Sequence, residues 1–188
     1  DNKVKASGSI DSLFKLLETQ NSETMEHTIR MRDNAILLGN ALGISINELC
    51  ELDLATRLHD IGKITIAEEI LLKPDRLTDE EFRVMKTHSE NGYKIVMASN
   101  GLENVAKAVL THHERWDGTG YPLSLKKDEI PLLARIISVV DAFDAMTSER
   151  PYQGAVEFED AMEEIIECRG THFDPKIVDE FINVFSYK

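Results

Sequence analysis

The residues in this sequence with the most chemical potential are its histidines, which recur on the apolar faces of expected helices. The chain of 188 residues contains six of them. His27, His59, His88 and His113 each stand three or four residues from apolar positions, as on one face of a helix. Acidic residues share or adjoin these faces. The resulting set of inward-facing ionisable groups is Glu23, His27, His59, Asp60, His88, His112, His113 and Asp141.

One inward histidine would be an ordinary hydrogen-bonded core residue, but eight such groups need a common explanation. Burying them is costly because each charged form loses its hydration. Divalent metal ions compensate that loss directly, since neutral imidazole and carboxylate are ordinary metal ligands. The pattern therefore predicts a metal centre in the core.

The number and spacing of these groups predict more than one ion. Helical neighbours point about 100° apart, so His59 and Asp60 do not easily chelate one ion together. They can serve two adjacent ions with Asp60 as a bridge, and two-metal hydrolytic sites hold their ions about 3.5–4 Å apart. Eight ligands exceed the coordination of one ion, so we expect two or three divalent ions. A shell without thiolate favours Fe or Mn over Zn.

The elements that must position these residues are helices. Apolar spacings of three and four predict an all-α fold, and no sustained alternation typical of strands is present. Capping patterns at Ser45 and Thr78, and a proline after Asp174, mark three helix starts. The connection 114–131 is long enough to be functional. The expected helices cover 22–42, 45–62, 66–71, 78–98, 102–113, 132–147, 155–169 and 174–185.

The charge balance limits the classes of partner. The chain has 34 Asp and Glu against 21 Lys and Arg, a formal net charge of −13. Nucleic acids and anionic membranes attract clustered cations, so this excess argues against a nucleic-acid polymer and against membrane contact. A small phosphorylated ligand stays possible, because a bound metal reverses the local charge of a pocket.

The length and segment composition favour one domain. We expect residues 1–21 to be a linker or the end of a connecting helix, and residues 22–188 to be the domain. A start at Asp1 rather than Met indicates a piece of a longer protein. Cys50 and Cys168 lie in apolar-periodic segments and are expected to be buried thiols in a reducing compartment.

The same features predict a cytoplasmic location. No secretory signal and no run of about 20 apolar residues is present in the sequence. The chain could belong to a protein that is wholly cytoplasmic. It could also be the cytoplasmic part of a larger membrane-linked or multidomain sensor.

Three sequence blocks resemble those of a known family, the bacterial HD-GYP domain, a branch of the HD superfamily of metal-dependent phosphohydrolases. His27 precedes the blocks, His88 lies between the first two, and the resemblance extends over roughly Glu23 to Asn183. The blocks are His59-Asp60-Ile61-Gly62-Lys63, His112-His113-Glu114-Arg115-Trp116-Asp117-Gly118-Thr119-Gly120-Tyr121-Pro122 and Val140-Asp141-Ala142-Phe143-Asp144-Ala145.

The resemblance implies a compact multi-helix bundle of HD type, with a metal centre in its core and a long loop that carries Gly-Tyr-Pro. It implies a phosphodiesterase that hydrolyses the bacterial second messenger cyclic di-GMP through a metal-bridging hydroxide. All eight residues above match metal-ligand positions, with Glu23 assigned to a third metal. The resemblance makes Asp60 and Lys63 the catalytic candidates, with Lys63 facing the substrate phosphate.

Further residues are expected around the substrate. The candidates for substrate contacts are Lys63, Arg115, Gly120, Tyr121 and Arg150. The Gly-Tyr-Pro loop of the family borders the active site and has been linked to partner domains, which makes a diguanylate cyclase or another signalling domain a candidate partner. Asp144 is expected to orient a neighbouring basic side chain or a metal ligand. The chain departs from the family at Gln153, where a basic residue is frequent, and this puts substrate affinity in doubt.

Two alternative functions stay open at this point. The first is an HD phosphohydrolase that acts on another cyclic dinucleotide, such as one with two different bases. The metals would not distinguish these substrates, because they contact the phosphate and not the base. The second is a signalling domain that binds a cyclic dinucleotide or a partner without hydrolysis. A product assay separates them.

Overall fold

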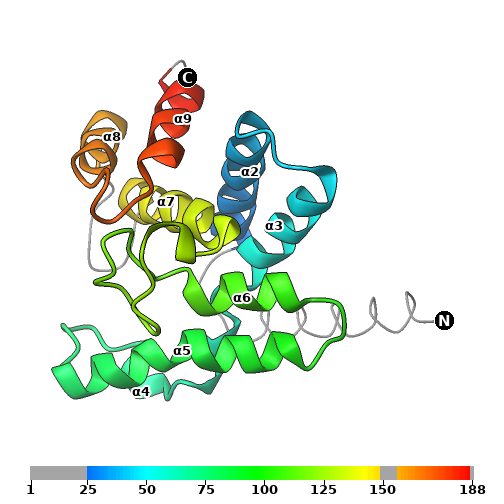
Figure 1. Cartoon of the computed structure of the whole chain (residues 1–188). Helices are drawn as coiled ribbons and strands as arrows, with labels where there is room; N and C mark the ends of the chain where they lie inside the picture. The colour runs from blue at the N-terminus through cyan, green and yellow to red at the C-terminus, as the bar shows by residue number, and fades with distance from the viewer. Residues whose placement is uncertain (1–24, 149–155, 187–188) are drawn as a thin grey trace.

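The computed structural model describes residues 25–148 and 156–186, whose regular elements are helices, without a strand (Figure 1). Two 3₁₀ turns, η1 (Ile61–Thr65) and η2 (Lys127–Glu129), interrupt the connections. The predicted all-α class is confirmed. The helices are α2 (Met25–Ala41), α3 (Ile46–Leu58), α4 (Glu68–Leu71), α5 (Asp79–Met97), α6 (Glu103–Thr111), α7 (Leu132–Thr147), α8 (Phe158–Glu167) and α9 (Pro175–Phe185).

The sequence signals at three helix starts act as predicted. The Ser45 side chain accepts a hydrogen bond from the backbone N–H of Glu48, and Glu48 accepts one from the backbone of Ser45. Thr78 and Glu81 form the same reciprocal box at the start of α5. The Asp174 side chain caps α9 ahead of its proline. These caps satisfy N–H groups that have no acceptor within the helix.

Helix α7 lies at the centre of the molecule, and α2, α6, α8 and α9 contact it (Figure 1). Helices α5 and α6 run antiparallel along one side, with η1 packed against α5. The fully buried side chains of the core include Met31 and Leu38 of α2, Ile136 and Ile137 of α7, and Phe181 of α9. This packing brings together residues that are far apart in the sequence.

Two helices end earlier than the sequence pattern predicts. Helix α3 ends at Leu58, and Asp60 has φ −100° and ψ 9°, after which η1 redirects the chain. Helix α6 ends at Thr111, so His112 and His113 follow the helix. These helix ends matter because His59, Asp60, His112 and His113 lie where the chain turns. The regular helical spacing therefore no longer fixes the directions of these side chains.

The expectation of buried thiols is wrong for Cys50, which is exposed on α3, and Cys168 is only half-buried. Leu52 and Ala55 fill the inward face of α3. Cys50 lies two residues before Leu52, about 200° around the helix, and therefore points outward.

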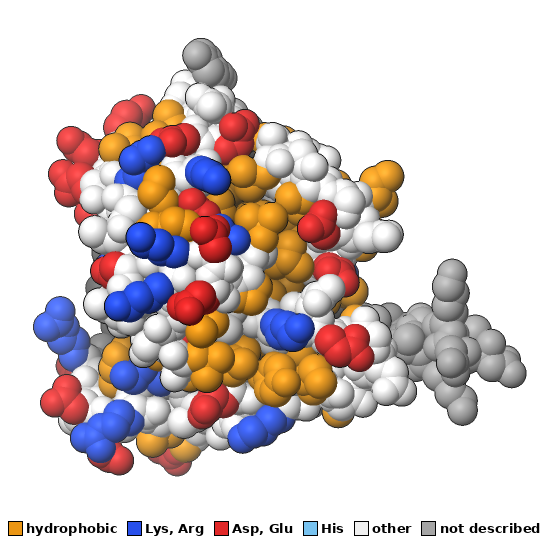
Figure 2. All heavy atoms as spheres, viewed as in Figure 1, with side chains coloured by type: hydrophobic (Ala, Val, Ile, Leu, Met, Phe, Trp, Pro, Cys, Tyr) orange, Lys and Arg blue, Asp and Glu red, His pale blue; other side chains and the backbone are white. Residues whose placement is uncertain are grey.

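The surface in Figure 2 carries charges of both signs between scattered apolar side chains. Lys and Arg side chains gather on the left half of this face, where Figure 1 places the 112–131 connection and the start of α5. No helix within the described residues combines the length and apolar content needed to cross a membrane.

Candidate metal centre

The structure brings seven of the eight predicted ligands into two groups, and Glu23 lies outside the described residues. Within each group, one ligand atom from every residue lies within 4.8 Å of the others. These residues come from α2, α5, α7 and the chain turns after α3 and α6. The first group is Asp60, His88, His112 and His113, and the second is His27, His59 and Asp141.

The backbone fixes which nitrogen three of the histidines present to the site. The Nδ1 atoms of His59, His88 and His112 lie 2.7–2.8 Å from the carbonyl oxygen three residues earlier. A carbonyl oxygen only accepts, so Nδ1 carries the proton and donates in each case. A neutral ring then has its lone pair on Nε2, which is the arrangement of a metal-binding histidine.

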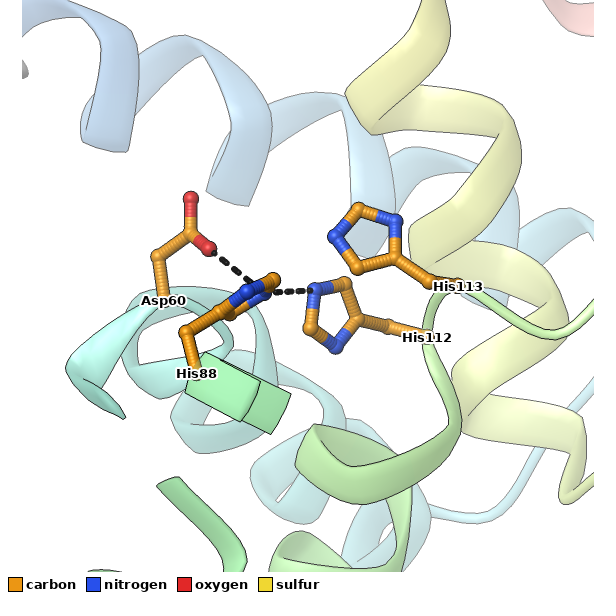
Figure 3. Close-up of side chains that lie close together, drawn as sticks. All are labelled: Asp60, His88, His112 and His113. Carbon is orange, nitrogen blue, oxygen red and sulfur yellow. Dashed lines mark hydrogen bonds and ion pairs between the residues drawn. The ribbon is translucent and has the colours of Figure 1, made fainter. Parts of the chain in front are cut away.

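The ligand atoms of the first group face one another in a way that requires a cation. Nε2 of His88 lies 3.4 Å from Nε2 of His112 and 3.3 Å from Oδ1 of Asp60 (Figure 3). Since both rings carry their proton on Nδ1, these contacts set lone pair against lone pair and lone pair against carboxylate. Oδ1 of Asp60 is also buried without a hydrogen bond. A divalent ion among these atoms turns the repulsion into coordination, so the donor set fits a metal.

Burial keeps the histidines neutral, as metal ligation requires. It lowers the pKa of His88 and holds the pKa of His112 well below the usual range. It lowers the pKa of His113 to about 3. Burial alone would raise the pKa of Asp60, but the ammonium of Lys63 and the neighbouring His59 and His88 together outweigh it and hold that pKa well below the usual range. At neutral pH the group therefore offers neutral imidazoles and one carboxylate.

Asp60 lies between the two groups. Its Oδ2 atom is 3.2 Å from Nε2 of His59 in the second group, while its Oδ1 atom is 3.3 Å from His88 in the first. A carboxylate in this place can bind one ion with each oxygen. Nζ of Lys63 lies 2.5 Å from the same Oδ2, so the predicted substrate-binding lysine is engaged with Asp60 in this structure.

Asp144 holds His27 in place from the other side of the site. Its Oδ2 atom lies 2.5 Å from Nδ1 of His27, and its Oδ1 atom accepts a hydrogen bond of 2.9 Å from Arg30. Burial raises the pKa of Asp144, but the hydrogen bonds from His27 and Arg30 outweigh it and bring that pKa to about 2. The carboxylate therefore contacts both a predicted ligand and a basic side chain, which is the arrangement expected for its orienting role.

We expect Asp144→Asn to lower the affinity for Mn²⁺ by about 10- to 100-fold, the usual cost of losing such a supporting carboxylate. The amide cannot hold the His27 ring by a charge-assisted bond, so Nε2 loses its fixed direction. Competition with a fluorescent chelator measures the affinity. Asp179→Asn is the matched control, because Asp179 makes a bidentate pair with Arg169 on the surface. Equal affinities in both variants would contradict this role.

The loop after His113 covers one edge of the centre. The Tyr121 ring stacks on the His113 ring with a centroid distance of 4.8 Å. Gly120 packs directly on the backbone, where an added Cβ would lie 2.3 Å from the nitrogen of Arg115. Buried Glu114 holds the loop by accepting hydrogen bonds from the backbone N–H groups of residues 123 and 125. Tyr121 and Gly120, two of the predicted substrate-binding residues, therefore lie beside the centre.

Two other predicted substrate residues are less closely placed. Arg115 lies 3.9 Å from Asp117 and is about one-third exposed. Arg150 lies outside the described residues. The Trp116 ring lies against α7, with the guanidinium of Arg135 5.7 Å from the ring centroid.

Two residues support the site without having been predicted to do so, Arg30 and Glu114. Arg30 follows His27 by three residues, so the helical spacing could have placed both on one face. Glu114 follows His113 directly, but its partners are backbone amides of the loop, which no residue pattern indicates.

Comparison with known proteins supports the assignment of the fold and the family. The family model of the HD domain matches residues 11–177. A cyclic di-GMP phosphodiesterase of Thermotoga maritima is 43% identical over 183 residues, covering 93% of this chain and 50% of that protein. A 3′3′-cGAMP-specific phosphodiesterase of Vibrio cholerae is 37% identical over 182 residues, covering 92% of this chain and 35% of that protein.

The fold agrees with a solved structure as well. A cyclic GMP-AMP specific phosphodiesterase of Vibrio cholerae superposes with a TM-score of 0.73 at 23% identity, over 94% of this chain and 48% of that one. The chain thus spans half or less of the lengths of these relatives. Because the family model covers most of its residues, the chain belongs to the HD domain family.

Proposed function

We propose that this chain is a metal-dependent phosphodiesterase that hydrolyses cyclic di-GMP. The observation that carries the proposal is the pair of adjacent ligand groups with Asp60 between them, where lone pairs oppose each other across short distances. Such a pair of sites suits phosphodiester hydrolysis, because two ions stabilise the attacking and the leaving oxygen together. The name of the Thermotoga relative supports cyclic di-GMP as the substrate.

In this proposal the two groups hold two divalent ions, Fe or Mn rather than Zn, and Glu23 would serve a third. Bound ions supply a water of low pKa and positive charge at the phosphate. Asp60 would supply a carboxylate to both groups, and its short contact with Lys63 favours the ionised form. Lys63 would face the substrate phosphate while it stays beside Asp60. Tyr121 borders the substrate through its stacking on His113, and Gly120 lets the loop lie close enough.

The second candidate substrate is the mixed dinucleotide cyclic GMP-AMP. One observation favours it, the 37% identity to a relative that is named as specific for it. The metal centre does not separate the two substrates, because it contacts the phosphate that both share.

The test uses anaerobically purified protein loaded with Fe²⁺ or Mn²⁺, with elemental analysis of the bound metal. Cyclic di-GMP and 3′3′-cyclic GMP-AMP are incubated separately, and chromatography separates the linear dinucleotide from GMP. We expect metal-dependent loss of cyclic di-GMP. Faster turnover of the mixed dinucleotide would favour the second candidate, and binding without product would favour a sensor domain.

The wider setting of the domain is part of the same proposal. A cytoplasmic location follows from a cyclic dinucleotide substrate, which bacteria make and degrade inside the cell. The loop 118–122 would contact a signalling domain such as a diguanylate cyclase, and the 54% exposed Leu123 beside it offers an apolar contact. Co-purification of a cyclase domain with the wild type and with Leu123→Ser tests that contact.

A further inference from the structure

Lys86 of α5 differs from several basic residues of the neighbouring elements. Those residues are paired with carboxylates: Lys63 with Asp60, Arg30 with Asp144, Lys73 with Glu81, Arg83 with Glu80 and Arg115 with Asp117. No ion pair involves Lys86 among the parts of the chain that the structure describes. Its charge is therefore available to an anion from outside the protein.

Two aromatic rings hold the Lys86 ammonium in place. Nζ lies 5.0 Å from the centroid of the Phe82 ring and 5.5 Å from the centroid of the Tyr121 ring. Both distances are within the range in which a ring attracts a cation without neutralising it. Phe82 is one helical turn before Lys86 on the same side of α5. The rings thus restrict the side chain and leave its charge uncompensated.

The ammonium is held one ring away from the metal centre. Tyr121, which contacts Lys86 on α5, also stacks on His113, a ligand of the first group. The Tyr121 ring therefore links the two. A molecule bound at the metals and extending past Tyr121 would meet the Lys86 ammonium next.

The chemistry of the proposed substrate supplies an anion for this place. A cyclic dinucleotide has two phosphodiesters, and only one of them can occupy the metal centre at a time. The other keeps its negative charge and needs a separate cation, in a protein whose net charge of −13 repels anions elsewhere. In Figure 2, Lys and Arg side chains lie among acidic ones over the start of α5 and the loop.

We propose that Lys86 binds the second phosphodiester of the cyclic dinucleotide, with Phe82 and Tyr121 as the residues that position its ammonium. This inference rests on the proposed function. Lys86 would then form a subsite that favours substrates with two phosphodiesters. A substrate with one phosphodiester would bind at the metals only and would gain nothing from Lys86. A merely structural Lys86 would support the hydrolysis of both kinds of substrate equally.

The experiment compares two substrates in the Mn²⁺-loaded enzyme. Cyclic di-GMP carries two phosphodiesters, and bis(p-nitrophenyl) phosphate carries one. For each variant, kcat/KM on the first is divided by kcat/KM on the second. The variants are Lys86→Met, which removes the charge and keeps the length, and Lys86→Arg, which keeps the charge. Lys94→Met, on an exposed position two turns further along α5, is the control.

We expect Lys86→Met to lower this ratio by about 10- to 100-fold, the usual loss for one hydrogen bond to a charged group. The loss should lie mainly in KM for cyclic di-GMP, because the contact persists from bound substrate to transition state. Lys86→Arg should retain most of the ratio, and Lys94→Met all of it. An unchanged ratio in Lys86→Met, or an equal loss in Lys86→Arg, would overturn the inference.

The wild type separates this inference from the proposed function. If the wild type cleaves the nitrophenyl ester and leaves cyclic di-GMP intact, the proposed function fails, and the inference fails with it. If the wild type cleaves both and the Lys86→Met ratio equals that of the wild type, only the inference fails.

Discussion

Replacement of His59 and Asp60 together by alanine is expected to abolish hydrolysis of cyclic di-GMP and to lower the amount of bound metal. The change removes one ligand from the second group and the carboxylate that lies between both groups. Activity should fall more than about 10³-fold, since the loss of one charge-stabilising donor already costs about 10²- to 10³-fold in other hydrolases. Elemental analysis after dialysis and the chromatographic product assay measure the two effects.

The control for this variant is Asn47→Ala with Cys50→Ala, two exposed residues of the same helix. It carries the same number of substitutions in α3 or beside it, and it touches neither ligand group. Circular dichroism establishes that both variants keep their helices. Full activity of the His59→Ala, Asp60→Ala variant would rule out the two-metal proposal.

The helices could be predicted because their signals are local. The capping boxes at Ser45 and Thr78 and the cap at Asp174 depend on side chains within three residues of the backbone groups that they satisfy. The gathering of ligands could be predicted because polar groups on apolar faces must meet in the core. His27 and Asp141 are far apart in the sequence, yet both lie on inward faces of helices that pack together.

The finer arrangement of the site could not be predicted, because it depends on where the chain leaves the helix. Helical spacing places His112 and His113 about 100° apart, but α6 ends before them, and both enter the first ligand group. The stacking of Tyr121 on His113 depends in turn on Glu114, whose carboxylate binds two loop amides. Such contacts between side chains and irregular backbone leave no periodic pattern in a sequence.

Gly62 lies where η1 packs on α5, next to the metal centre. Gly62→Ala is therefore expected to lower both the free energy of unfolding and the amount of bound metal. A Cβ at this position would lie 1.8 Å from the carbonyl oxygen of His88 and 2.6 Å from the backbone nitrogen of Gly92. These neighbours are backbone atoms of α5, so no side-chain rotation can relieve the contact. Either α5 moves away from η1, or η1 changes its path between Asp60 and Lys63.

Both responses separate ligands of the first group, because Asp60 belongs to the η1 side and His88 to the α5 side. We expect the free energy of unfolding to fall by about 3 kcal/mol, the upper part of the usual range for an overpacked core, as measured by urea denaturation of the metal-free protein. The metal content of the folded variant should fall with it. The measurement on metal-free protein isolates the packing cost from the loss of bound ions, which themselves stabilise the folded state.

A second glycine separates this steric effect from the general cost of replacing glycine. Gly101 has a φ of +82° and no atom within 4 Å of the position of an added Cβ. Gly101→Ala should therefore cost only the strain of the left-handed backbone, about 1–2 kcal/mol, and should leave the metal content unchanged. If Gly62→Ala instead kept its metal, the close packing of η1 on α5 would not be what holds Asp60 and His88 together. The two substitutions add the same methyl group, and only Gly62→Ala pushes Asp60 and His88 apart.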